Sequence, residues 1–303
     1  MSGITITPLT TTIGARIDGI DLAQPLDAAA TRAIKAALAT HSVIAFSGQD
    51  IDLAQQKTFS RIFGELEPVL SHRLVGANDT ATVLDNRLWG TAAAGKLPNA
   101  FHLNDEFQGW HVDSSYCPQI PSVSTLRAEV LPPVGGGTGW ASMACAYEGL
   151  SPAMQAWLET LSAVHAPPPG QREVLDVASL PQVEQDHWDR ELAARTHPLV
   201  VVHPVSGRKG LFVNPSYVVK IDTLSNQESA MLLRFLFRHC IRPDFIYRHR
   251  WSEGDILVWD QLATIHLAPN DYLPHERRVV RVTAGLTTPT GVMARPQRAA
   301  MAG

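Results

Sequence analysis

The chain has 303 residues, of which 45% are hydrophobic and 18% charged, so it carries ample apolar material for a buried core. A formal net charge of −4, with Lys and Arg scattered rather than clustered, argues against a nucleic-acid partner. The N-terminus lacks a signal-peptide pattern, and no apolar stretch approaches the ~20 residues that cross a bilayer. The three cysteines are widely spaced, which fits reduced thiols. We therefore expect a cytoplasmic protein without a membrane partner.

The first part of the chain predicts short strands and two helices. Residues 4–22 read as short strands broken by glycines. Residues 27–41 follow helical periodicity, with one apolar face formed by Ala30, Ile34, Ala37 and Leu38. Residues 42–46 read as a buried strand, and residues 52–63 as a second helix that Gly64 ends.

Beyond residue 121 the pattern becomes mostly extended. The predicted strands are Val123–Val130, Gly139–Met143, Leu199–His203, Gly210–Val213, Phe245–His249, Ile256–Trp259 and Val279–Leu286. Two helices interrupt them, at 152–161 and 226–239. Many short strands with helices at the edges predict a mainly β fold with α, a double-stranded β-helix (a jelly roll of the cupin kind) flanked by helices.

We find no linker in the sequence and expect one domain over residues 1–303. Two long segments of mixed composition, 73–107 and 166–196, are predicted as lid-like insertions. Surface insertions without a function are the alternative.

The segment Gly109-Trp-His111-Val-Asp113 places a histidine and a carboxylate two residues apart. In an extended strand these positions share a face, so both side chains can converge on one ion. Two histidines and one carboxylate on one side of a metal leave the opposite positions open, which suits iron(II) that activates dioxygen. A hydrogen-bonded surface pair is the more modest interpretation of His-X-Asp alone.

Among twelve histidines, His266 is the best candidate for the third ligand. It follows the buried strand 256–260, and Arg277 and Arg281 come after it on or beside another strand. Arg277 is suited to hold a carboxylate through two parallel hydrogen bonds. Thr138 follows the glycine-rich stretch 132–137 and opens a strand, so its hydroxyl could donate to the same carboxylate. This stretch does not end in the Gly-Lys-Ser/Thr of a phosphate-binding loop, and no dinucleotide-binding fingerprint follows it.

The chain resembles the TauD/TfdA family of iron(II)/2-oxoglutarate dioxygenases, which includes taurine dioxygenase, aryloxyalkanoate dioxygenases and alkylsulfatases. The resemblance runs from about Ile6 to Gly285 and rests on several motifs in order. These are Ile6-Thr-Pro-Leu9, Ile13-Gly-Ala-Arg-Ile-Asp-Gly19, Phe63-Gly-Glu-Leu66, Trp110-His-Val-Asp113, Gly135-Gly-Gly-Thr-Gly-Trp140, His203-Pro-Val-Ser-Gly207, Phe212-Val-Asn214, and Trp259-Asp260 through His266 to Asp271-Tyr-Leu-Pro274.

The resemblance implies a role for each matched residue. His111, Asp113 and His266 would bind Fe(II), while Thr138 and Arg277 would hold the distal carboxylate of 2-oxoglutarate. With O2 as the other co-substrate, the implied reaction hydroxylates a C–H bond and releases succinate and CO2. Related halogenases carry a small residue in place of the carboxylate, so Asp113 favours hydroxylation. Relatives commonly form dimers or tetramers, and we expect a homo-oligomer.

Arg281 matches an arginine that often meets an anionic group of the substrate. The alternative is an ion pair between Arg281 and an acidic side chain. Val69 and Phe107 stand where the taurine enzyme carries polar side chains, and an aromatic is retained as Tyr217. His72 could still supply a donor. These residues favour a larger organic anion over taurine, such as an alkyl sulfate, an alkyl sulfonate or an aryloxyalkanoate.

Three alternatives remain open at this point. An amino acid or a natural-product acid in a biosynthetic pathway could be the substrate of the same chemistry. A non-redox metal hydrolase or isomerase on a cupin-like barrel could use the same three ligands, although it would not need Thr138 and Arg277. A non-catalytic jelly-roll binding module would leave His-X-Asp accidental.

Overall fold

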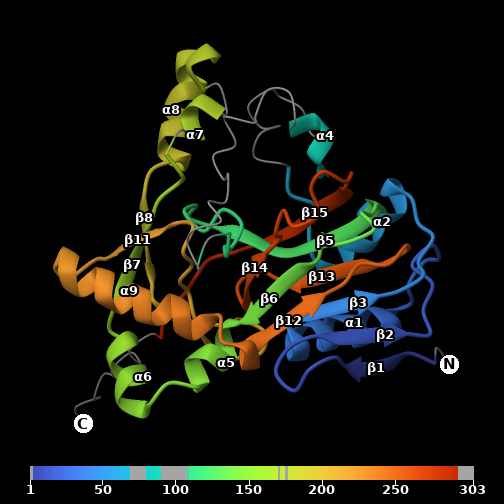
Figure 1. The fold of residues 1–303 in the computed structure, drawn as a ribbon, viewed down its shortest axis with the longest axis horizontal. Helices are drawn as coiled ribbons and strands as arrows, with labels where there is room; N and C mark the ends of the chain where they lie inside the picture. Colours follow the sequence, from blue (N-terminus) through green and yellow to red (C-terminus); the bar gives the residue numbers. More distant parts are fainter. Residues whose placement is uncertain are drawn as a thin grey trace, which may run out of the picture.

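A seven-stranded sheet forms the centre of the computed structural model, which describes residues 3–68, 80–89, 107, 109–169, 171–174 and 177–292 (Figure 1). Its strand order is β1-β2-β3-β13-β5-β15-β4, and only β2 and β3 pair in parallel. The strands are β1 (Thr5–Pro8), β2 (Ala15–Asp18), β3 (Val43–Phe46), β4 (Ala81–Asp85), β5 (Ile120–Val130), β13 (Ile256–Asp260) and β15 (Arg278–Thr287).

A second, antiparallel sheet faces the first and has the order β12-β6-β14. It consists of β6 (Thr138–Ser142), β12 (Ile246–His249) and β14 (Thr264–Leu267). Two smaller sheets join β11 (Val218–Ile221), β7 (Ser162–His165) and β8 (Arg195–Pro198), and β9 (Val200–Val202) and β10 (Lys209–Leu211). The facing sheets form the predicted jelly roll.

Strand β13 is buried on both faces, which explains its unbroken apolar sequence. Ile256 and Val258 join the cluster under the N-terminal helices, whereas Leu257 and Trp259 face the second sheet. This alternation follows the two-residue period of a strand. The rings of Trp259 and Trp140 of β6 lie 5.6 Å apart between the two sheets, and both are almost fully buried. Truncating either to Ala would cost about 3–5 kcal/mol.

Helix α1 (Ala28–His41) covers the outer face of the seven-stranded sheet, with contacts to β2, β3 and β13. Its buried residues are the four predicted ones: Ala30, Ile34, Ala37 and Leu38. Asp27 caps it by accepting a hydrogen bond from the amide of Ala30. Helix α2 (Leu53–Ser60) begins with a capping box between Asp52 and Gln55 and continues as the 3-10 turn η1 (Arg61–Phe63).

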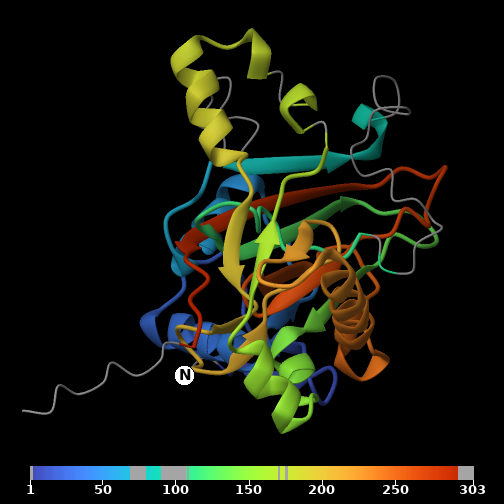
Figure 2. The same cartoon turned by 90° about the vertical axis from the view of Figure 1, so that its left-hand side faces the viewer.

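The remaining helices lie beside the smaller sheets or stand clear of them (Figures 1 and 2). They are α4 (Asn86–Trp89), α5 (Met143–Glu148), α6 (Pro152–Leu158), α7 (Gln171–Val174), η2 (Val177–Ser179), α8 (Gln182–Glu191), α9 (Asn226–Cys240) and η3 (Pro243–Phe245). Helix α9 buries one face in the largest apolar cluster. Helices α7 and α8 stand away from the sheets, at the top of both views.

Several elements differ from the sequence predictions. Among the described residues, helix and strand are present in similar amounts, with the helices flanking the sheets of the predicted fold. Helices α5 and α8 were not expected, and neither was strand β14, which carries His266. The segment 166–196 contains α7, η2 and α8. Of 73–107, only 80–89 and 107 are described, so the lid function of both segments stays a prediction.

Candidate active site

A pair of main-chain hydrogen bonds joins His111 to His266 of β14. The amide of His111 donates to the carbonyl of His266 at 3.0 Å, and the amide of His266 donates back at 2.9 Å. Residues paired in this way across antiparallel strands place their side chains on the same face. The two imidazole rings accordingly lie with their centroids 4.1 Å apart.

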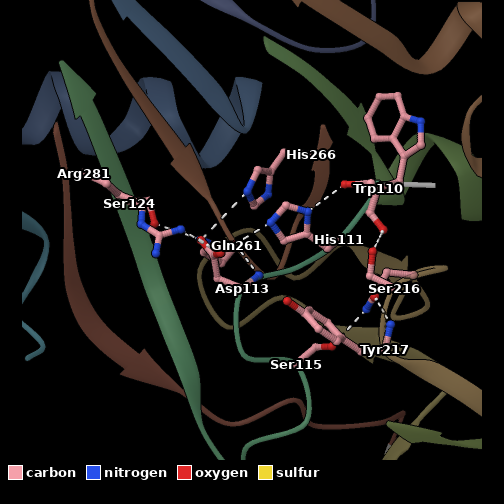
Figure 3. Close-up of polar contacts among 12 residues, drawn as sticks. Trp110, His111, Asp113, Ser115, Ser124, Ser216, Tyr217, Gln261, His266 and Arg281 are labelled. Carbon is pink, nitrogen blue, oxygen red and sulfur yellow. Dashed lines mark hydrogen bonds and ion pairs between the residues drawn. The ribbon is translucent and has the colours of Figure 1, made fainter. Parts of the chain in front are cut away.

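Asp113 completes the cluster from the turn that follows the bridge residue His111. Its Oδ1 is 3.5 Å from Nε2 of His111, and its Oδ2 is 3.9 Å from Nε2 of His266. One ligand atom from each of the three residues lies within 4.8 Å of the others. Figure 3 shows the three side chains pointing toward one another. The structure therefore brings together the three residues that the sequence analysis selected as metal ligands.

The hydrogen bonds and electrostatics of the cluster suit a divalent metal. Nδ1 of His111 lies 2.7 Å from the carbonyl of Gly109, which can only accept, so Nδ1 carries a proton and Nε2 is the nitrogen nearest Asp113. Burial and the neighbouring His111 hold the pKa of His266 well below its usual range, which leaves that imidazole neutral. Burial raises the pKa of Asp113, but Arg281 and the two histidines outweigh it and hold that pKa well below normal. Two imidazoles and one carboxylate are the donor set of a non-haem iron(II) site.

Arg281 reaches this cluster from β15. Its Nη1 forms an ion pair with Oδ1 of Asp113 at 2.8 Å (Figure 3). The alternative interpretation of Arg281, a pair with an acidic side chain, is thus found here, with Asp113 as the partner. The predicted contact with an anionic substrate stays a prediction. The Nε of Arg281 is buried and has no hydrogen-bond partner among the described residues.

Arg277 and Thr138 fit the carboxylate of a co-substrate. The Arg277 side chain is almost fully buried, and its Nε donates to the carbonyl of Gly136 at 3.0 Å, while its Nη2 has no partner in the described part of the chain. A buried guanidinium nitrogen without an acceptor is costly, so an anion bound there would be stabilised. The Thr138 oxygen accepts from the indole of Trp251 at 3.0 Å, which leaves its own proton to donate. These contacts agree with the predicted 2-oxoglutarate site.

The residues predicted to line a substrate pocket are only partly placed. The Tyr217 ring stands edge-on to His111 with centroids 6.2 Å apart, so it borders the metal cluster. Phe107 lies against Phe237 of α9, with centroids 6.0 Å apart. Val69 and His72 lie outside the described residues. The pocket role of all four stays a prediction.

Sequence reasoning missed Gln261, which lies in the turn between β13 and β14. Its amide donates to Oδ2 of Asp113 at 2.6 Å and to the hydroxyl of Ser124 at 2.8 Å. No motif marks such a residue. The sequence offers one indication: Gln261 follows closely after the four buried apolar residues of β13. A side-chain amide in such a place is costly unless it is hydrogen-bonded.

Comparison with known proteins decides the family. Residues 5–283 match the model of the family described as "Taurine catabolism dioxygenase TauD, TfdA family". The chain belongs to the TauD/TfdA family. Its members are α-ketoglutarate-dependent dioxygenases, so this protein is an oxidoreductase of that class, and the predicted co-substrates 2-oxoglutarate and O2 are confirmed.

Among its TauD/TfdA relatives is the alpha-ketoglutarate-dependent sulfate ester dioxygenase of Pseudomonas putida, 35% identical over 94% of this chain and 90% of the relative. The alkylsulfatase of Acinetobacter baylyi is 30% identical, over 93% and 85%. A crystal structure of a taurine dioxygenase from Burkholderia xenovorans is 32% identical and superimposes with a TM-score of 0.76, covering 95% of this chain and 93% of that one. The predicted jelly-roll fold is confirmed.

Proposed function

We propose that this enzyme is an iron(II)/2-oxoglutarate dioxygenase that hydroxylates the carbon next to the ester oxygen of an organic sulfate. The observation that carries the metal assignment is the convergence of His111, Asp113 and His266 within 4.8 Å. The unpartnered Nη2 of buried Arg277 supports the co-substrate assignment. Bound iron(II) would supply the redox chemistry that couples the oxidation of 2-oxoglutarate to hydroxylation.

The side chains of the protein would bind, orient and desolvate the reactants. Arg277 and Thr138 would fix the distal carboxylate of 2-oxoglutarate, so that its keto acid end faces the three ligands. Tyr217, which is edge-on to His111, would form an apolar wall beside the reacting carbon. Arg281 would present its free Nε–H to the negative group of the substrate while its Nη1 neutralises Asp113.

The substrate assignment rests on this arginine and on the two relatives that act on sulfate esters. Hydroxylation of an alkyl sulfate R–CH2–O–SO3⁻ gives R–CH(OH)–O–SO3⁻, whose C–O bond then breaks with both electrons leaving on sulfate. The hydroxyl proton is lost and an aldehyde forms. The balanced reaction converts alkyl sulfate, 2-oxoglutarate and O2 into aldehyde, sulfate, succinate, CO2 and a proton.

Succinate release across a panel of candidate substrates tests the proposal. The panel contains medium-chain alkyl sulfates, alkyl sulfonates, aryloxyalkanoates, taurine and amino acids. We expect the highest catalytic efficiency with an alkyl sulfate, together with equal amounts of aldehyde, sulfate and succinate. Sulfate release without O2 and 2-oxoglutarate would instead indicate a hydrolase, and a preference for taurine or an amino acid would overturn the substrate class.

The proposal includes a cytoplasmic location and a homo-oligomeric state. No helix among the described residues combines the length and the apolar composition of a membrane span. None of the three cysteines, all of which the structure describes, forms a disulfide, which is typical of a reducing compartment. Fractionation of the native host tests the location, and light scattering coupled to size-exclusion chromatography tests for a dimer or tetramer.

A further inference from the structure

Gln261 contacts the candidate metal ligand Asp113 at two places. Its Nε2 donates to the carboxylate Oδ2 at 2.6 Å, and its Oε1 accepts from the Asp113 amide at 3.4 Å (Figure 3). The Gln261 side chain is fully buried, so water does not compete for these contacts. One amide therefore ties the carboxylate of Asp113 to its own main chain.

The orientation of the Gln261 amide has a single solution. An ionised carboxylate accepts only, so the NH2 end must face Asp113 Oδ2, and the oxygen must then face the backbone N–H. The second proton of Nε2 goes to Ser124 of β5 at 2.8 Å. The main-chain N–H of Gln261 donates to the main-chain carbonyl of Ser122 at 3.0 Å. Both the main chain and the side chain of Gln261 are thus anchored on β5.

A second anchor holds the turn that carries Gln261. Oδ1 of Asp260 accepts from the amides of Leu262 and Ala263, each at 2.9 Å. Oδ2 of Asp260 lies 2.8 Å from Nε2 of His203. Because Nδ1 of His203 accepts from the Ser206 amide at 3.0 Å, its Nε2 carries the proton and donates to Asp260. The turn is therefore held on both sides of Gln261.

We propose that Gln261 is a positioning residue that fixes the rotamer of Asp113 toward the two histidines. The inference rests on the proposed metal site and adds a residue that acts through one of its ligands. Arg281 pulls on Oδ1 of the same carboxylate at 2.8 Å. Without the amide at Oδ2, the carboxylate would be free to rotate about its side-chain bonds toward Arg281, so the three ligands would no longer be held in place before the metal arrives.

Metal binding to the apoprotein tests this role without any turnover. Anaerobic titration with Co(II), followed by its visible absorption, gives both the affinity and the ligand geometry. Gln261→Met keeps the size of the side chain but removes all three hydrogen bonds. We expect it to bind Co(II) about 10–100-fold more weakly, as is typical when a hydrogen-bond partner of a metal ligand is lost. The spectrum of the Co(II) complex should change as well.

Gln56 of α2 offers a matched control. It is also fully buried, and its amide also makes three contacts, to the Val280 carbonyl at 3.0 Å, Thr125 at 3.5 Å and Arg127 at 3.2 Å. Gln56→Met should lower the unfolding temperature like Gln261→Met but leave Co(II) affinity unchanged. Unchanged affinity and spectrum in Gln261→Met would overturn the proposal.

Two further variants separate the positioning role of Gln261 from the metal site itself. Gln261→Asn keeps an amide that is one methylene too short for the 2.6 Å contact, and we expect it to weaken Co(II) binding at least 5-fold, on the order of the ~1 kcal/mol of one net hydrogen bond. If Gln261→Met does not fold, wild-type affinity in Gln261→Asn refutes the positioning role. His266→Ala should abolish Co(II) binding. If His266→Ala still binds Co(II), the metal site itself is refuted. If His266→Ala loses Co(II) binding while the Gln261 variants keep wild-type affinity, only the positioning role is refuted.

Discussion

Arg281 and Asp113 form an ion pair of 2.8 Å between β15 and the candidate metal cluster. The pair offsets the charge of a buried carboxylate, whose desolvation alone would raise its pKa. Only one nitrogen of the guanidinium is used in this pair, and its Nε has no partner among the residues that the structure describes. In the proposed site, Arg281 would neutralise the metal ligand Asp113 and offer a second donor to an anion.

The first prediction concerns this arginine. Arg281→Met keeps part of the apolar stem but removes the charge and the donors. At saturating iron(II), we expect the preferred alkyl sulfate to bind at least 30-fold more weakly, in line with the ~2–5 kcal/mol lost when one partner of a charged hydrogen-bonded pair is removed. Uncoupled 2-oxoglutarate decay without substrate should continue. The measurement compares the KM for substrate with the rate of uncoupled succinate release.

Arg281→Lys is the companion variant, because it keeps the charge but loses the fork. Its substrate affinity should fall between wild type and Arg281→Met. Wild-type substrate affinity in Arg281→Met would assign the arginine to the Asp113 pair alone.

The second prediction concerns the three ligands. Ala at His111, Asp113 or His266 removes one of three protein donors, so iron-dependent succinate formation should fall below detection. The far-ultraviolet circular dichroism should stay unchanged, because the core clusters do not depend on an ion. His187→Ala, at an exposed histidine of α8, is the control and should keep full activity. Near-normal turnover in the His266 variant would show that another histidine is the ligand.

The third prediction separates Arg277 from its neighbour. Arg277→Leu would leave the distal carboxylate of 2-oxoglutarate in a poorly solvated site, so the KM for 2-oxoglutarate should rise at least 30-fold, again from ~2–5 kcal/mol. Thr138→Val should raise it about 2–10-fold, since one neutral hydrogen bond contributes about 0.5–1.5 kcal/mol. Arg278 pairs with Glu129 at 2.8 Å, and Arg278→Leu should leave this KM unchanged. A KM that rises equally in both arginine variants would contradict the assignment.

The fourth prediction concerns stability at acid pH. Burial, helped by the neighbouring His197, lowers the pKa of His165 to about 3. Between pH 6.5 and 3 the unfolded chain therefore binds a proton that the folded chain does not, and stability must fall as pH falls. One such histidine contributes a slope of about 1.4 kcal/mol per pH unit. Urea unfolding of wild type and His165→Asn between pH 4 and 6 should show this difference in slope. Equal slopes would show that His165 gains its proton in the folded state.

The sequence predicted the elements whose pattern lies within one stretch of chain. Helix α1 was found because its four buried residues recur at helical spacing. Strand β13 was found because both of its faces are apolar. In each case the residues that define the element are neighbours in the sequence, so local periodicity is sufficient.

Other elements depend on partners far away in the sequence. Strand β14 has only four residues and exists because β6 pairs with it. Helix α8 buries only Trp188 and has no side-chain cap, so it offers no periodic pattern. Helix α5 follows β6 directly, and Ser142 turns the chain from strand to helix by capping the Cys145 amide. The convergence of His111 and Asp113 was predicted from strand geometry, but His111 lies in an isolated bridge and Asp113 in a turn. The contacts of Arg281 and Gln261 with Asp113 depend on the packed sheets and left no sign in the sequence.

The main-chain bridge between His111 and His266 joins positions separated by about half of the chain. When a nascent polypeptide has left the ribosome only as far as β13, it carries one histidine and the carboxylate of the proposed site. These two ligands alone would hold a metal ion weakly. Only when β14 docks on β6 does the second imidazole arrive. In the proposed site, the set of iron ligands would therefore be complete only after β14 has docked, which would make metal loading a late step in the biogenesis of the enzyme.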